Sequence, residues 1–84
     1  MPQTRATVVV LMNHYEPGQM GTVWVVPGDY QPARDEEPLP DELPRAIRIA
    51  GPIDLSECPG IVAGLRRAFD ELGIATEELV YSDD

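Results

Sequence analysis

Two places in this chain carry side chains that could do acid–base or nucleophilic chemistry. The first is His14 with Glu16, because a histidine next to a carboxylate can serve as an acid–base pair. Both residues fall where the sequence predicts the tip of a hairpin, and no second histidine or nucleophile accompanies them. A lone histidine is not a catalytic triad. We therefore interpret this pair as a polar hairpin tip.

The second place is Cys58, which falls in the first turn of a predicted helix. The positive end of a helix dipole there can lower a thiol pKa and favour the reactive thiolate. The chain has no CxxC pair and no second cysteine that could resolve an oxidised form. The sequence favours a small packed residue over a redox or nucleophilic one. A single cysteine also excludes an internal disulfide and fits a reducing compartment.

Cofactor and metal sites have no support in the sequence. One histidine and one cysteine are too few for a zinc site, and the acidic residues do not follow the EF-hand pattern. The glycines form neither a dinucleotide-binding nor a P-loop motif. We expect no cofactor and no catalytic residue, and we predict that the protein is not an enzyme.

Charge is the strongest compositional signal. The 84 residues are enough for one domain, and they include 15 acidic and 6 basic residues, a net charge of −9. Such a field repels nucleic acid and anionic membranes and attracts a partner with a basic surface, although many proteins are acidic simply to stay dispersed. With no apolar run of about 20 residues and no secretory signal, we expect a cytoplasmic protein.

The hydrophobic pattern predicts a small α+β domain over residues 1–84, with an antiparallel sheet packed against one helix. Residues 7–15 and 21–26 are expected to form a hairpin around a turn at 16–19. Since the first strand is apolar on both faces, it is either central and covered on each side, or part of an interface. A third strand is expected over 45–50, with a short helix from Asp41 as the alternative.

A helix is expected after this strand. Asp54 with Glu57 has capping-box spacing, Ser56 is a second candidate cap, and Pro59 fits the first turn. Gly73 is expected to end the helix in a Schellman motif, in which Phe69 and Ile74 take the C3 and C″ positions. For residues 76–82 we favour a final strand over one more helical turn.

The remaining feature is an acidic, proline-rich loop over about 27–44, which contains the stretch RDEEPLPDELP at 34–44. Proline fixes φ and favours extended, polyproline II-like backbone, so the loop is predicted to hold its carboxylates in a preorganised strip. Leu39 and Leu43 are expected to tuck against the sheet or helix. The predicted partner-binding residues are Asp35, Glu36, Glu37, Asp41 and Glu42.

These features suggest a non-enzymatic protein that docks on a basic, nucleic-acid-binding surface of a larger partner. It would be a monomeric inhibitor of the nucleic-acid-mimic type, such as a phage or mobile-element protein directed at a CRISPR effector, restriction enzyme or polymerase. The plainer interpretation of 34–44 is a solvated connecting loop. An alternative function is an oligomeric assembly module that associates through the apolar first strand and Trp24, unless Trp24 belongs to the core.

Overall fold

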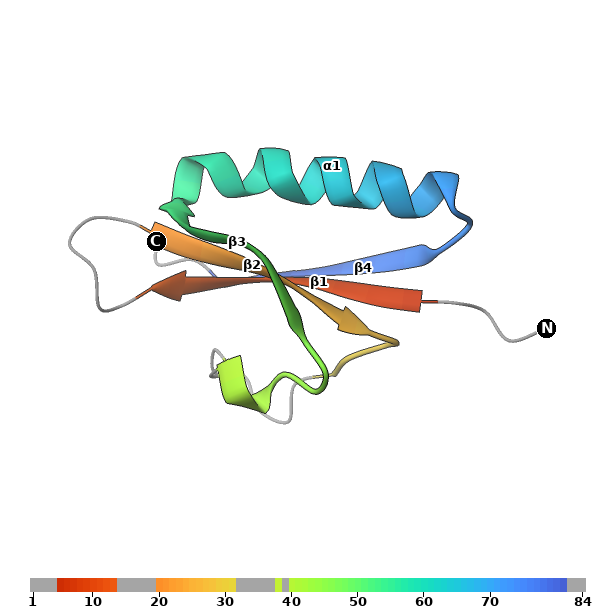
Figure 1. The fold of residues 1–84 in the computed structure, drawn as a ribbon, viewed down its shortest axis with the longest axis horizontal. Helices are drawn as coiled ribbons and strands as arrows, with labels where there is room; N and C mark the ends of the chain where they lie inside the picture. The colour runs from red at the N-terminus through yellow and green to blue at the C-terminus, as the bar shows by residue number, and fades with distance from the viewer. Residues whose placement is uncertain (1–4, 14–19, 32–37, 39, 82–84) are drawn as a thin grey trace.

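Figure 1 shows the chain as a computed structural model, with a four-stranded sheet and one long helix in two layers. The structure describes residues 5–13, 20–31, 38 and 40–81. The α+β class predicted from the sequence is confirmed. The elements are β1 (Arg5–Asn13), β2 (Met20–Pro27), the short 3-10 helix η1 (Pro40–Glu42), β3 (Ile47–Asp54), the 3-10 helix η2 (Leu55–Glu57), α1 (Cys58–Glu71) and β4 (Ala75–Val80).

The strand order is β3-β2-β1-β4. β1 and β2 pair antiparallel, as the predicted hairpin requires, while the predicted turn at 16–19 lies outside the described residues. β3 is antiparallel to β2, but β4 is parallel to β1, so the sheet is mixed and not antiparallel throughout. The reason is the connection: α1 carries the chain from one edge of the sheet to the other, and such a crossover joins parallel strands.

β1 is one of the two inner strands of the sheet, and its residues 6–11 are covered on both faces. Val8 and Val10 point toward α1, and Val9 and Leu11 point to the other side; all four are at most 2% exposed. A strand buried on both faces has a continuous apolar run instead of an alternating one. Of the two possibilities that the sequence left open for this strand, the central position is the one observed.

The first of two hydrophobic cores lies between the sheet and α1. The helix contributes Cys58 and Val62, which pack with Val8, Val10 and Val23 from the sheet. Partly buried apolar side chains surround this centre, namely Ala50, Ile53, Leu55, Ile61, Leu65 and Phe69. The apolar residues that recur at helical spacing between 61 and 69 thus face the sheet, as predicted.

The beginning of α1 differs from the predicted capping box. Asp54 accepts hydrogen bonds from the backbone N–H and the hydroxyl of Ser56, at 2.9 and 2.8 Å, and so caps η2. The α-helix starts only at Cys58, and its N-cap residue Glu57 makes no side-chain capping bond. Pro59 lies in the first turn, as expected, where its missing N–H costs nothing. A 3-10 turn thus separates the predicted cap from the helix.

The end of α1 follows the prediction. Ile74 N–H donates to the Phe69 carbonyl at 2.8 Å, and Gly73 N–H donates to the Asp70 carbonyl at 3.0 Å. Gly73 has φ of 76°, which glycine adopts without a steric penalty. These are the two bonds of a Schellman motif. The chain then enters β4 at Ala75, so the favoured strand is observed, over 75–80.

β3 is a bent edge strand that begins and ends later than the predicted 45–50. Trp24 pairs with Arg48 and Val23 with Ala50, so Ile49 is the extra residue of a bulge. Further along, Gly51 has φ of 115°, and a Cβ there would lie 2.7 Å from the Gly21 carbonyl oxygen. The bend brings β3 backbone against β2 so closely that only glycine fits.

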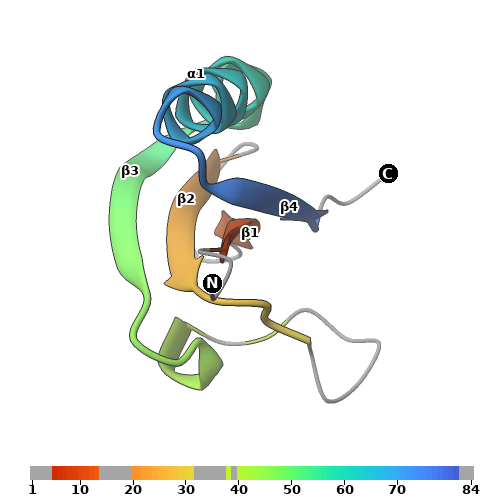
Figure 2. The ribbon, with the colours of Figure 1, turned by 90° about the vertical axis from the view of Figure 1, so that its right-hand side faces the viewer.

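The face of the sheet opposite α1 carries the second core. Val9, Leu11 and Val26 from the sheet pack there with Leu43. Trp24, Tyr30, Ala46, Leu79 and Tyr81 lie around them. Figure 2 shows η1 and the chain that leads into β3 beyond the face of the sheet that α1 does not cover. The predicted acidic loop at about 27–44, called the acidic segment below, therefore contributes to a hydrophobic core at its C-terminal end.

Candidate functional site

The acidic segment is fixed to β1 where it leaves β2. The hydroxyl of Thr7, a residue that is 1% exposed, donates to the Gly28 carbonyl and accepts from the Tyr30 N–H, each at 3.0 Å. Gly28 N–H donates to the Arg5 carbonyl at 2.8 Å, and Arg5 forms a 3.4 Å ion pair with Asp29. Because a buried hydroxyl needs partners, the single threonine in an apolar strand was a signal that sequence reasoning passed over.

The segment is fixed a second time near its end. Leu43 is 5% exposed and packs on Val9, Leu11 and Val26, while Pro38 is also buried. The expectation that Leu43 tucks against the sheet is confirmed; Leu39 lies outside the described residues. The loop is not a detached connection, since its apolar residues form part of the domain's second core.

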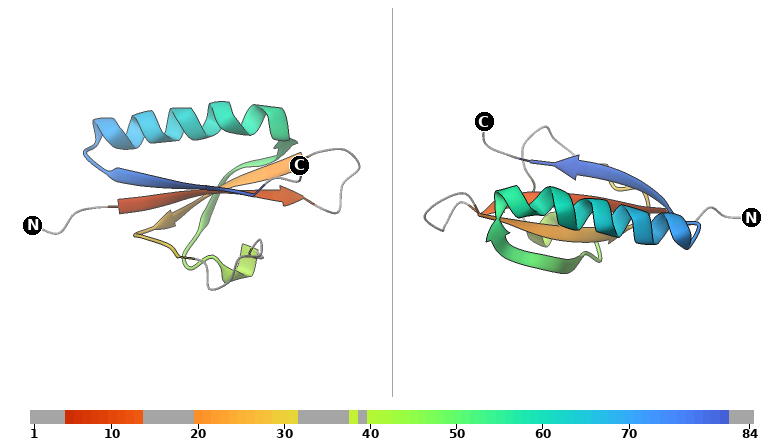
Figure 3. Two further views of the ribbon diagram at one scale, coloured as in Figure 1. Left: turned by 180° about the vertical axis from the view of Figure 1, so that it is seen from behind. Right: turned by 90° about the horizontal axis from the view of Figure 1, so that it is seen from above.

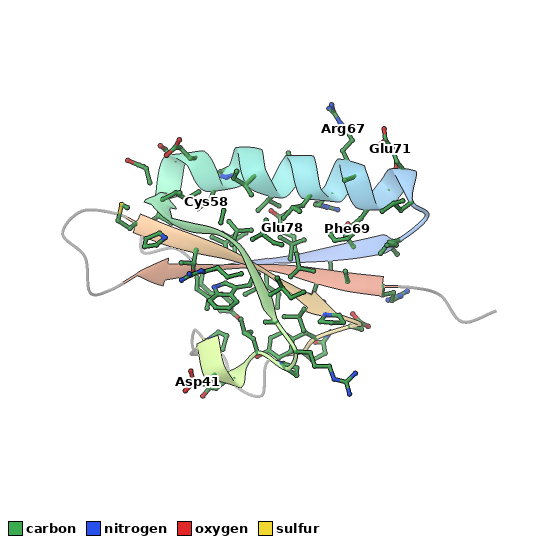
Figure 4. All side chains as sticks on the ribbon, in the orientation of Figure 1. Asp41, Cys58, Arg67, Phe69, Glu71 and Glu78 are labelled. Carbon is green, nitrogen blue, oxygen red and sulfur yellow. The ribbon has the colours of Figure 1, made fainter. Side chains whose placement is uncertain are left out.

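Asp41 and Glu42 are exposed and belong to η1. Figure 4 shows Asp41 on the side of η1 that faces away from the sheet. The extended backbone expected for this stretch is wrong at 40–42, because a 3-10 turn forms there. Proline fixes φ near −65°, a value that suits the first turn of a helix as well as polyproline II. Asp35, Glu36 and Glu37 lie outside the described residues.

The acidic residues at the end of α1 and in β4 form a second group, which is separate from the carboxylates of η1. Figure 4 shows Glu71 on the outer side of α1, whereas Asp41 is beyond the other face of the sheet. Glu78 is engaged locally: Arg66 donates to it at 3.1 Å and to the Thr76 hydroxyl at 3.3 Å. The net charge is thus spread over both sides of the domain, and one flat partner surface cannot meet both groups.

Cys58 is a core residue. Its side chain is buried beside Gly21, with Sγ 3.9 Å from the Asp54 carbonyl oxygen. Burial, and then the nearby charges of Glu57 and Asp54, raise the pKa of the Cys58 thiol. The helix N-terminus therefore does not produce a thiolate here, and the interpretation of Cys58 as a packed residue fits its surroundings.

The other residues singled out in the sequence are His14, Glu16 and Trp24. His14 and Glu16 lie outside the described residues. Trp24 is partly buried, packs on the second core and donates from Nε1 to the Thr22 hydroxyl at 2.8 Å. Residues 6–11 of β1 are buried, so this described part of the strand offers no apolar surface to a partner. Within the described segments, no three histidine, cysteine or acidic residues are grouped as metal ligands.

Comparison with known proteins gives no further guide to function. No family model matches the chain, and neither the curated proteins nor the solved structures include a match. Among the described residues, α1 is the one long helix, and it is too short and too polar to cross a membrane. Function is therefore inferred from the fold and from the surface chemistry alone.

Proposed function

We propose that the protein is a non-enzymatic binding protein that presents the acidic segment to a basic surface of a larger partner. The observation that supports this most directly is the difference in burial between the acidic residues of η1 and the residue that follows them. Leu43 is buried in the second core, while Asp41 and Glu42, immediately before it, are exposed. The carboxylates are thus held at a fixed place on the sheet and are not carried on a free chain.

Preorganisation is what makes this arrangement suitable for binding. Carboxylates on a loose chain lose conformational entropy when a partner orders them, and that loss weakens the complex. Here Thr7 holds the beginning of the segment and Leu43 its end. Part of the ordering has therefore already occurred on folding, and less remains to oppose association.

The partner that suits such a surface is a nucleic-acid-handling protein with an arginine- or lysine-lined groove. An anionic surface competes for the same cationic groups as a phosphate backbone. The protein would inhibit by occupying that groove, as an inhibitor encoded by a phage or mobile element would. A CRISPR effector, a restriction enzyme and a polymerase are targets of this kind.

A charge-neutralising pair of variants tests the proposal. Asp41→Asn with Glu42→Gln removes two charges from η1, and Asp70→Asn with Glu71→Gln removes two from the other side of the domain. Each variant is titrated against immobilised polyarginine and against a panel of nucleic-acid enzymes in competition with DNA. The first pair should lower affinity about tenfold and reduce its salt dependence, and the second should change it little. Equal losses would mean that net charge alone governs binding.

A further inference from the structure

The two edges of the sheet differ in chemistry, and together they suggest a second kind of contact. β3 and β4 are the outermost strands, and within the described residues each pairs along one side only. Figure 3 shows them at opposite edges, on either side of α1. An edge strand exposes unpaired N–H and C=O groups that can accept another strand. Pro52 interrupts the second half of β3, but residues 47–50 contain no proline.

Both edges carry an exposed apolar side chain on the same face of the sheet. Ile47 is 63% exposed and pairs with Val25, which pairs with Val8 in the core beneath α1. Val80 is 54% exposed and pairs with Val10, also in that core. Side chains of directly paired residues lie on one face. Ile47 and Val80 therefore both project on the α1 side, at opposite edges.

The other face carries opposite charges at the two edges. Arg48 of β3 pairs with Trp24, and Glu77 of β4 pairs with Thr7, both of which lie on the face away from α1. Arg48 and Glu77 are exposed, and neither forms an ion pair within the described part of the chain. On the face away from α1, the domain thus has a positive charge at the β3 edge and a negative charge at the β4 edge.

We propose that the β3 edge of one copy docks beside the β4 edge of a second copy, which continues the sheet from one molecule into the next. Both strands run parallel to β1, so the new pair is parallel and the α1 helices stay on one face. In the register that places Arg48 opposite Glu77 on one face, Ile47 lies opposite Thr76 on the helix face, and Val80 lies further along that same face of the junction. This contact does not depend on the proposed binding of a basic partner.

Other pairings of the same edges are less favourable. Two β3 edges would bring Arg48 against its own copy, and two β4 edges would do the same for Glu77; like charges opposite each other destabilise a strand pair. An inverted copy would place Ile47 on the face that carries Glu77. The favoured contact is heterologous and does not close on itself, so assemblies grow with concentration. The net charge of −9 opposes this growth and keeps the association weak.

Charge reversal on each edge provides the test. Arg48→Glu and Glu77→Arg each place like charges at the junction, so each variant alone should lose at least about tenfold in association constant. Mixed together they should associate again, because every junction between unlike copies has one positive and one negative edge. Sedimentation velocity of the full chain across a wide concentration range, for each variant and for the equimolar mixture, measures this.

Matched changes on the outer side of α1 separate the contact from net charge. Arg67→Glu and Glu71→Arg alter charge by the same two units at positions that point away from the sheet (Figure 4), and they should associate as the unaltered protein does. If net charge alone mattered, Glu77→Arg, which is less negative, would associate more strongly than the unaltered protein. That result, a mixture that stays monomeric, or an unaltered protein that stays monomeric at every concentration would overturn the proposal.

Discussion

The hydroxyl of Thr7 accepts a hydrogen bond at 3.0 Å from the backbone N–H of Tyr30, 23 residues further along the chain. The same hydroxyl donates to the Gly28 carbonyl. One buried side chain in the central strand therefore fixes the direction in which the acidic segment leaves the sheet. Position and charge of the segment are set by different residues, and each can be altered separately.

Replacing Thr7 with valine keeps the shape of the side chain but removes both bonds. The Tyr30 N–H and Gly28 carbonyl lose their partner, and we expect the free energy of unfolding to fall by about 1–3 kcal/mol. Thr76→Val is the control, because the Thr76 hydroxyl takes part only in an exposed bond from Arg66, and its loss should be smaller. Urea denaturation measures both variants. Equal stability of Thr7→Val and the unaltered protein would contradict the anchoring role.

Leu43→Ala tests whether the acidic segment belongs to the core. Truncation of a buried leucine costs about 2–5 kcal/mol, and Leu43 is 5% exposed. Leu72→Ala removes the same atoms from a side chain that is 72% exposed, so we expect a change within about 0.5 kcal/mol. Thermal and urea unfolding compare the two variants. A small effect at Leu43 would mean that the segment lies loosely on the sheet.

Gly51→Ala and Gly64→Ala should act in opposite directions. A methyl group at Gly51 meets the Gly21 carbonyl oxygen at 2.7 Å, at a φ of 115° that alanine rarely adopts, so we expect a loss of about 2 kcal/mol or more. Gly64 lies within α1, where a methyl group meets nothing within 4 Å. Alanine there should raise stability by about 0.5–1 kcal/mol. Denaturation midpoints that shift in the same direction would refute the proposed difference.

Cys58 should make stability depend on alkaline pH. Its pKa is raised above the ordinary value of 9.0, chiefly by burial, so the folded state holds the thiol proton at a pH where the unfolded state releases it. Stability from this residue is complete below pH 9.0 and declines as the pH rises toward and through the folded pKa. We expect Cys58→Ala to be less stable near neutral pH but to lose less stability than the unaltered protein between pH 8 and 10. Parallel slopes for the two proteins would contradict this.

The sequence predicted the parts of the fold that depend on local patterns. Glycine after a run of helically spaced apolar residues located the end of α1, and the double apolar face of residues 8–11 indicated a strand that is either central or part of an interface. It did not predict the parallel pairing of β4, because strand direction follows from the crossover of α1 and not from any residue in β4.

The candidate site was less predictable for a similar reason. Asp41 and Glu42 were expected in extended backbone, but the burial of Leu43 and the turn at Pro40 draw the chain into a 3-10 helix. The separation of the η1 carboxylates from those of α1 depends on which side of the sheet each segment covers. The composition gives the net charge of the chain. Which charges face the same side depends on how the helix and the acidic segment are placed on the two faces of the sheet (Figure 1).

The apolar run in β1 has a consequence for how the strand finds its alignment. Val8, Val9, Val10 and Leu11 are so alike that a shift by one position, which turns every side chain to the opposite face, would still give two apolar faces. Hydrophobicity therefore specifies the position of this strand only weakly. Thr7 is different: shifted, its hydroxyl would enter the core beneath α1 and leave Gly28 and Tyr30 behind. Thr7, the buried polar residue among the described side chains of the strand, thus marks the correct alignment for the residues that follow it.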